Sequence, residues 1–484
     1  MTNAVLLATG RFILIALACV CASSAAMAQT TTIGGAADNL DRRLCGSGDP
    51  AQVIGGCSRI IKDPGALTEL KVLALQNRGF VYQRTGQLDQ AAADYASALA
   101  LAPSDHAANA RIYVNLGLIH TQTGDQAGAL ADYGQAIALG PSLVSAYVNR
   151  ASIFMARGQN DRAIADLDQA IRLKPKEAAA YASRGALYAV VGDRERAIAD
   201  LTQALSLDPS NATAWRDRSL AYRANGETDK AAADAAEAAR LAPNSGESHQ
   251  DLGLSLQAAG DSEHAISEFG KAIELNPLDA RAIKARGDSY LAQGDRDHAI
   301  ADFSQAIGLD AKMVTAYNNR GVAYLGKSDW DAAISDFTTV ITLSPDQSSA
   351  YLNRGEAFEA RHDRAHAIAD FSQAIQIDPS AIEAYRQRAF LREQTGDRPG
   401  AIADYDLVIA RNPNDAEALR GRGAARLHQH AFDGAIIDLT AAIAINPKDA
   451  LAYRFRSLAY AAKSDSRHAL DDDATALRLD PASR

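Results

Sequence analysis

A 34-residue period in the sequence constrains the fold of this chain more than any other feature. The segment HAIADFSQAI stands at residues 298–307 and again at 366–375, and it belongs to a longer pattern, A-x-x-D-[FYL]-x-x-A-[IL]-x-[LI]-x-P. The final proline recurs at Pro103, Pro141, Pro175, Pro209, Pro243, Pro277, Pro345, Pro379, Pro413, Pro447 and Pro481, and Ala311 takes the one missing place. Every interval after Pro141 is then 34 residues, and the first is 38. Twelve copies therefore follow residue 68, so the 484 residues form a repeat array rather than roughly three globular domains.

Each copy is expected to form two helices. With the proline as position 32, the first helix places Tyr, Gly and Tyr at positions 4, 8 and 11, as in AYNNRGVAY at 316–324, and these offsets share one helical face. The second helix places Ala, an aromatic residue or Leu, and Ala at positions 20, 24 and 27. A glycine at position 15, such as Gly192, favours a left-handed helix end, and the aspartate after it, Asp193, can cap the next helix. Neither helix buries its apolar face alone, so stability must come from stacking.

Composition supports an all-α fold with a finely packed core. Hydrophobic residues make up 47% of the chain, aromatic residues only 6%, and alanine is the commonest residue, which favours close helix contacts through small side chains. The formal net charge of −10 argues against nucleic acid or anionic lipid as the main partner.

The pattern resembles the tetratricopeptide repeat, a 34-residue helix-turn-helix with small residues at positions 8, 20 and 27, large ones at 4, 11 and 24, and Pro at 32. The family's Trp at position 4 is matched literally only by Trp215, with Tyr in six other copies. The resemblance covers roughly 85% of the chain. It implies a right-handed α-solenoid superhelix over residues 68–484, whose inner groove, lined by the first helix of each repeat, binds segments of other proteins.

Position 7 departs from the family pattern, in which Leu is usual. It is Arg in ten repeats, whereas position 23 is acidic in all twelve. Because position 7 shares a face with 4, 8 and 11, its guanidinium should be partly buried and should need a carboxylate partner. We predict a structural ladder of ion pairs, within or between repeats, and interpret it as a spine that fixes register. Its central members are Arg150, Arg184, Arg320 and Arg354 with Asp166, Asp200, Asp336 and Asp370.

The resemblance also implies which residues line the groove, namely those at positions 2, 5, 9 and 12. The candidate partner-binding residues at positions 5 and 9 are Val114, Leu118, Val148, Lys284, Leu352, Arg386, Phe390, Arg420 and Arg454. This set predicts an apolar early groove and a cationic stripe at Arg386, Arg420 and Arg454, interrupted by glutamates, that receives an extended or acidic partner segment. The alternative is a solvated, salt-bridged surface.

The N-terminal sequence predicts a secretory signal peptide followed by a cap segment. Arg11, the apolar run 12–20 and the A-x-A motif ending at Ala28 predict a signal peptide over residues 1–28, with lipidation of Cys19 or Cys21 as the rival interpretation. A periplasmic or secreted protein follows from it. In that compartment Cys45 and Cys57 are most simply a disulfide that staples a helix at 53–61 within a cap segment at 29–67; the rival interpretation is a redox-active pair.

No catalytic or metal-binding motif stands out. The chain has no phosphate-binding loop, nucleophile elbow or zinc-protease motif, and His264, His298, His366 and His468 all fall at position 19, as surface variants. We therefore expect no cofactor, no metal and no enzymatic activity. The leading hypothesis is a periplasmic scaffold that binds partner proteins in envelope assembly or secretion. The alternatives are a self-associating structural solenoid and an accessory subunit of a polysaccharide export machine.

Overall fold

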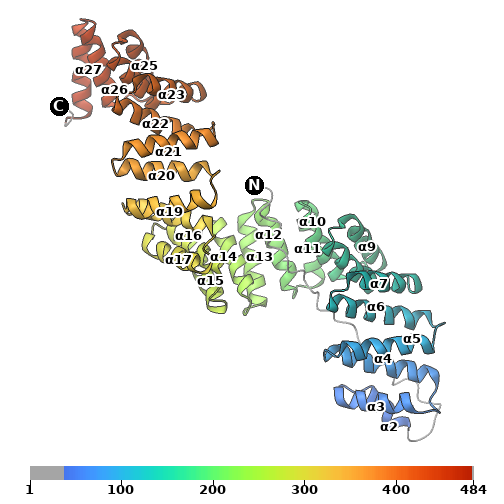
Figure 1. Cartoon of the computed structure of the whole chain (residues 1–484). Helices are drawn as coiled ribbons and strands as arrows, with labels where there is room; N and C mark the ends of the chain where they lie inside the picture. Colours follow the sequence, from blue (N-terminus) through green and yellow to red (C-terminus); the bar gives the residue numbers. More distant parts are fainter. Residues whose placement is uncertain (1–37, 482–484) are drawn as a thin grey trace. The chain divides into compact units, whose positions relative to one another are not determined.

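The computed structural model describes residues 38–481 and contains helices and turns, with no strand in that range (Figure 1). The signal peptide predicted for residues 1–28 lies outside the described residues. The chain divides into two compact units, a first unit that ends at Pro243 and a second unit that begins at Asn244.

The helices of the first unit are α2 (Asp38–Cys45), α3 (Pro50–Lys62), α4 (Thr68–Arg84), α5 (Leu88–Leu101), α6 (His106–Thr123), α7 (Gln126–Leu139), α8 (Val144–Ala156), α9 (Asn160–Leu173), α10 (Ala178–Val190), α11 (Arg194–Leu207), α12 (Ala212–Ala224) and α13 (Thr228–Leu241). The helices of the second unit are α14 (Gly246–Ala258), α15 (Ser262–Leu275), α16 (Ala280–Ala292), α17 (Arg296–Leu309), α18 (Val314–Gly326), α19 (Trp330–Leu343), α20 (Ser348–Ala360), α21 (Arg364–Ile377), α22 (Ile382–Thr395), α23 (Arg398–Arg411), α24 (Ala416–His428), α25 (Phe432–Ile445), α26 (Ala450–Ala462) and α27 (Ser466–Leu479). From α4 onward, even-numbered helices are the first helix of a repeat and odd-numbered helices the second, as the period predicts.

The turn between the two helices follows the predicted chemistry in every repeat. The residue at position 15 has a positive φ in all twelve copies: eight are glycine, and the others are Ser328, His362, His430 and Ser464. The next residue frequently caps the second helix; the Asp193 carboxylate, for example, accepts a hydrogen bond from the backbone N–H of Arg196. His362 and His430 are therefore turn residues in the left-handed conformation.

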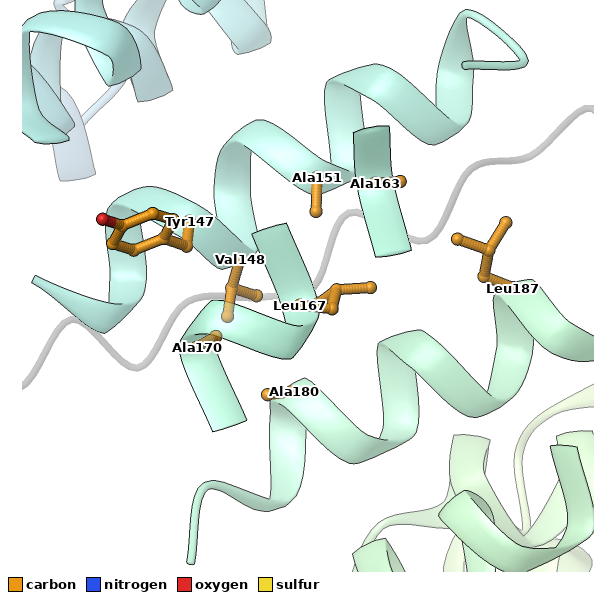
Figure 2. Close-up of a cluster of buried hydrophobic side chains, with 8 residues drawn as sticks. All are labelled: Tyr147, Val148, Ala151, Ala163, Leu167, Ala170, Ala180 and Leu187. Atoms are coloured by element: carbon orange, nitrogen blue, oxygen red, sulfur yellow. The ribbon is translucent and has the colours of Figure 1, made fainter. Parts of the chain in front are cut away.

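Packing within each unit joins neighbouring repeats through small residues. Each first helix packs on its own second helix, and the second helix packs on the first helix of the next repeat. At position 8, a Cβ added to Gly355 would lie 2.6 Å from the ring of Phe371, so only glycine allows this helix contact. The core is therefore shared between repeats, as the cluster of Tyr147, Val148, Ala151, Ala163, Leu167, Ala170, Ala180 and Leu187 from α8, α9 and α10 shows (Figure 2).

The N-terminal segment contains one helix more than the sequence predicted. The helix expected at 53–61 is α3, which begins at Pro50 under the Asp49 cap, but α2 precedes it and packs against it. Gly56 allows this contact, because a Cβ there would lie 2.7 Å from the backbone nitrogen of Cys45. The short, polar sequence of α2 has no repeat pattern that could have revealed it.

Candidate functional site

The position-7 arginines and the position-23 aspartates form bidentate ion pairs within single repeats. Arg320 donates from Nε to Asp336 Oδ2 at 2.8 Å and from Nη2 to Oδ1 at 2.7 Å. The same fork joins Arg150 to Asp166, Arg184 to Asp200 and Arg354 to Asp370, at 2.7–2.9 Å. The aspartates are buried and the arginines partly buried. Each carboxylate thus has a geometrically matched cation.

In most repeats a third hydrogen bond of the arginine extends this ion pair, which is one rung of the ladder, to the preceding repeat. Arg320 Nη1 donates to Ser304 Oγ at 2.9 Å, and Arg354 Nη1 donates to the Thr338 hydroxyl at 3.1 Å, in both cases at position 25 of the repeat before. At Arg184 and Arg422 the acceptor is a carboxylate, that of Asp168 or Asp406. The choice that the sequence left open is therefore resolved: the ion pair lies within a repeat, and the third bond links repeats.

Aromatic residues at positions 4 and 11 flank the guanidinium. The Arg320 guanidinium carbon lies 5.6 Å from the Tyr317 ring centroid and 5.9 Å from that of Tyr324. The hydrogen bonds to Asp336 raise the pKa of Arg320 above its ordinary value, despite the opposing effect of burial. These tyrosines are packing residues that hold the ion pair of Arg320 and Asp336 in place.

Histidines replace the arginine in the two repeats that have Leu at position 7. In the repeat of Leu116, His120 Nδ1 lies 2.7 Å from Asp132 Oδ2. In the repeat of Leu252, His249 Nδ1 lies 2.7 Å from Glu268 Oε2. Burial raises the pKa of Asp132, and the His120 contact partly offsets this shift. The repeat register could have suggested both partners, since His120 stands at position 11 and His249 at position 4.

The first-helix face is our name for the side chains at positions 2, 5, 9 and 12 of the even-numbered helices α4–α26. In the first unit the structure places several of the predicted binding residues in the core. Val114 is 3% exposed and packs with Ala146, and Val148 is 7% exposed and packs with Ala180, so the next first helix covers both. Leu118, and Leu352 in the second unit, are partly buried against core clusters. Val114 and Val148 therefore cannot line a binding surface, because an aliphatic residue at position 5 faces the neighbouring helix.

The predicted cationic stripe is largely neutralised. Arg386 donates from Nη2 to Asp415 Oδ2 at 2.9 Å, and Arg420 donates from Nη1 to Asp449 Oδ2 at 2.8 Å. Asp415 and Asp449 are buried N-cap residues of the following first helices. The equivalent position for Arg454 is residue 483, which lies outside the described residues. Arg386 and Arg420 thus hold the N-cap aspartates of α24 and α26 in place. Their positive charges are neutralised by these aspartates and do not form a free cationic stripe.

Polar side chains continue along the first-helix face of the second unit and at the adjoining position 6. Lys284 Nζ donates to Asp288 at 2.7 Å, Asn319 Nδ2 donates to Asp288 at 2.7 Å, and Asn353 Nδ2 donates to Asn318 at 3.3 Å. Lys284 is therefore also paired. The exposed apolar side chains on this face are Val322, Phe390, Leu451 and Leu458, of which Phe390 is 45% exposed.

The remaining candidates have simple structural roles. Cys45 and Cys57 lie side by side at the α2–α3 contact, with Cα atoms 4.7 Å apart, a separation that a disulfide spans. Each position-19 histidine lies beside its helix cap; His298 Nδ1, for example, is 2.7 Å from the Asp295 carboxylate. Residues 38–481 contain no group of three potential metal ligands. A shallow depression of about 570 Å³ is lined by residues 158–162 and Val191, most of which are polar.

Comparisons with known proteins agree with this geometry. Tetratricopeptide repeat family profiles match residues 187–246, 251–314, 284–348, 318–382 and 391–450, and further profiles described as tetratricopeptide repeat and TPR repeat match 71–141 and 151–192. The chain belongs to the tetratricopeptide repeat family, whose members generally mediate protein–protein interaction and are typically non-catalytic scaffolds. No curated protein matches the chain.

Solved structures to which this chain is similar include proteins from bacteria and yeast. A tetratricopeptide repeat protein from Parabacteroides merdae is 19% identical over 52% of this chain and 98% of its own, with a TM-score of 0.39. The Pseudomonas aeruginosa protein pilF is 19% identical over 44% and 96%, with a TM-score of 0.39. Yeast Tom70 is 17% identical over 86% and 100%, with a TM-score of 0.36. Across residues 38–481, no helix is both long and apolar enough to cross a membrane.

Proposed function

We propose that this protein is a non-enzymatic scaffold of the bacterial periplasm that holds polypeptide segments of partner proteins on its first-helix face. The observation that carries the proposal is the exposure of Phe390, Leu451 and Leu458 on that face, at positions 2 and 9. Exposed apolar side chains in a row of parallel helices are a surface suited to an extended segment. The signal peptide that the sequence predicts for residues 1–28 supports the compartment.

The partner-binding test uses exposed residues, so that the fold is left intact. Phe390→Ser with Leu458→Ser removes two apolar groups from the first-helix face. The control, Leu278→Ser with Ile437→Ser, removes two apolar groups elsewhere in the second unit that are even more exposed, at 74% and 68%. Charge reversal at Arg386 or Arg420 is unsuitable, because it would leave the buried carboxylates of Asp415 and Asp449 beside a negative charge.

The readout is photo-crosslinking in periplasmic extract, followed by mass spectrometry of the cross-linked partner. We expect the wild type and the control to capture the same partner through residues of the first-helix face, and the Phe390/Leu458 variant to lose it. Capture that both variants retain contradicts the proposed surface.

Localisation is tested separately by cell fractionation and N-terminal sequencing. We expect the mature chain to begin at Gln29. A chain that stays in the cytoplasm with Met1 intact contradicts the periplasmic role.

A further inference from the structure

The polar contacts along the first-helix face of the second unit are interrupted at α20. On one side, Lys284, Asp288, Asn319, Asn318 and Asn353 form hydrogen bonds from α16 to α20. On the other side, Gln387 donates to Glu383 within α22, and Arg386 bridges Glu383 and Asp415. Glu356 lies between these two groups, on α20.

Glu356 is a half-buried carboxylate with no partner. Within the described part of the chain it makes no hydrogen bond and no ion pair, and its nearest charged neighbours are two more carboxylates, Glu383 and Glu359. Burial first, and these two charges second, raise the pKa of Glu356 above its ordinary value. Glu359 differs, because the positive charge of Arg364 partly compensates it.

Among the described residues, Glu356 and Glu359 are the two half-buried carboxylates of α20 without a hydrogen bond or ion pair, and only Glu359 has a compensating positive charge, that of Arg364. The buried aspartates at position 23 each have an arginine fork, and the cap residues Asp415 and Asp449 have one arginine each. Where the fork arginine is missing, at Leu116 and Leu252, a histidine takes its place. A partly desolvated carboxylate costs free energy unless a cation meets it, and no positive charge in the described part of the chain compensates Glu356, so a cation from outside would relieve this cost.

Apolar side chains flank Glu356 on both sides. It occupies position 9 of its repeat, and the same position holds Val322 in the repeat before and Phe390 in the repeat after. Val322 is 38% exposed and Phe390 is 45% exposed. Lysine and arginine have this combination of a charged end and an apolar stem, and a guanidinium or ammonium also packs favourably on a phenylalanine ring.

We propose that Glu356 binds a lysine or arginine side chain of an extended partner segment, whose apolar stem and neighbouring residues cover Val322 and Phe390. The inference rests on the proposed function, since it names the chemistry of the segment that the first-helix face receives. The charge of this segment is opposite to the sequence-based prediction, which expected an acidic partner. Arg386 and Arg420 are already paired, so the unsatisfied charge beside Val322 and Phe390 is the negative charge of Glu356, and the complementary segment is basic.

The test is selection of a random octapeptide library, displayed on phage, against the immobilised mature chain. The variant is Glu356→Gln, which keeps the side-chain shape and removes the charge. The control is Glu274→Gln, an exposed residue near the end of α15 that changes the net charge by the same amount. Thermal unfolding verifies that both variants fold; Glu356→Gln should be at least as stable as the wild type, because it removes an unpaired half-buried charge.

We expect the wild type and Glu274→Gln to enrich peptides with Lys or Arg beside an apolar residue, and synthetic copies of these peptides to bind Glu356→Gln about tenfold more weakly or worse. Enrichment of acidic peptides, or basic peptides that bind Glu356→Gln equally well at other residues, overturns the inference and leaves the proposed function standing. If no peptide of either charge is enriched, and the photo-crosslinking finds no partner on this face, both proposals fail.

Discussion

At the residue scale, the position-7 arginine connects three helices at once. Its fork joins the first and second helices of one repeat, and its third nitrogen reaches the second helix of the repeat before, as at Arg320 with Asp336 and Ser304. Lysine could not replace it, because a single ammonium lacks the planar fork that satisfies two carboxylate oxygens and a hydroxyl together. In the repeats that precede those of Arg150 and Arg286, position 25 is glycine, which has no hydroxyl or carboxylate to accept the bond from the third nitrogen.

Removing one member of a rung should cost far more than removing both. We expect Arg320→Leu to lower the free energy of unfolding by about 3–5 kcal/mol, because Asp336 stays buried without a cation. The double variant with Asp336→Leu should recover most of this loss. Urea unfolding followed by Trp330 fluorescence in a Trp215→Tyr background measures the effect locally, since Trp330 begins α19. A double variant no more stable than the single one would contradict this account of the rung.

At the element scale, each helix pair is defined by its turn, and the aspartate caps make the turn sensitive to pH. The hydrogen bond from His298 lowers the pKa of Asp295, and His366 lowers that of Asp363 in the same way. A carboxylate whose folded pKa is below its unfolded value contributes stability that is present above the unfolded pKa and is lost as the pH falls through the folded pKa.

Acidification should therefore weaken these second helices below about pH 4, the ordinary range of a free aspartate. Asp295→Asn together with Asp363→Asn retains a capping side chain but cannot titrate. We expect the double variant to show a smaller loss of thermal stability between pH 6 and pH 3 than the wild type, measured by circular dichroism. An identical pH profile for both proteins would show that other carboxylates govern acid unfolding.

The α2–α3 element should depend on the bond predicted between Cys45 and Cys57. A disulfide that closes a loop of this size contributes about 2–4 kcal/mol, mainly by restricting the unfolded chain. We expect Cys45→Ala with Cys57→Ala, or reduction of the wild type, to speed hydrogen exchange in α2 and α3 while α8–α11 remain unchanged. Alkylation of the denatured, unreduced mature protein followed by mass measurement should find no free thiol at residues 45 and 57; two alkylated cysteines would disprove the bond.

At the scale of the whole molecule, stability within each unit should be a sum of repeats and of contacts between neighbouring repeats. Helices contact mainly their own partner and the adjacent repeat, so damage should stay local. The chain is accordingly not expected to unfold in one two-state transition.

Phe337→Ala tests this locality in the second unit. Phe337 lies in α19, at position 24 of its repeat, and is fully buried. Its truncation to Ala should lower the free energy of unfolding by about 3–5 kcal/mol. Hydrogen exchange measured by mass spectrometry should accelerate in α17–α21 and stay unchanged in α25–α27, several repeats away. Uniform acceleration across the second unit would instead indicate one cooperative block.

The sequence by itself determined the repeat, the two helices of each copy, the left-handed turns at position 15 and the two positions, 7 and 23, that form most of the ladder. These features depend on residues a few positions apart in one helix, or on contacts that recur every 34 residues, so a linear pattern records them. Only the tertiary structure decided which residues of the first-helix face are available. Val114 and Val148 are covered by the next first helix, Arg386 and Arg420 form ion pairs with the cap aspartates 29 residues further along, and Glu356 is left without a cation. The physical reason is that exposure and charge pairing at these positions depend on the distance between neighbouring helices, which the identity of a residue does not encode.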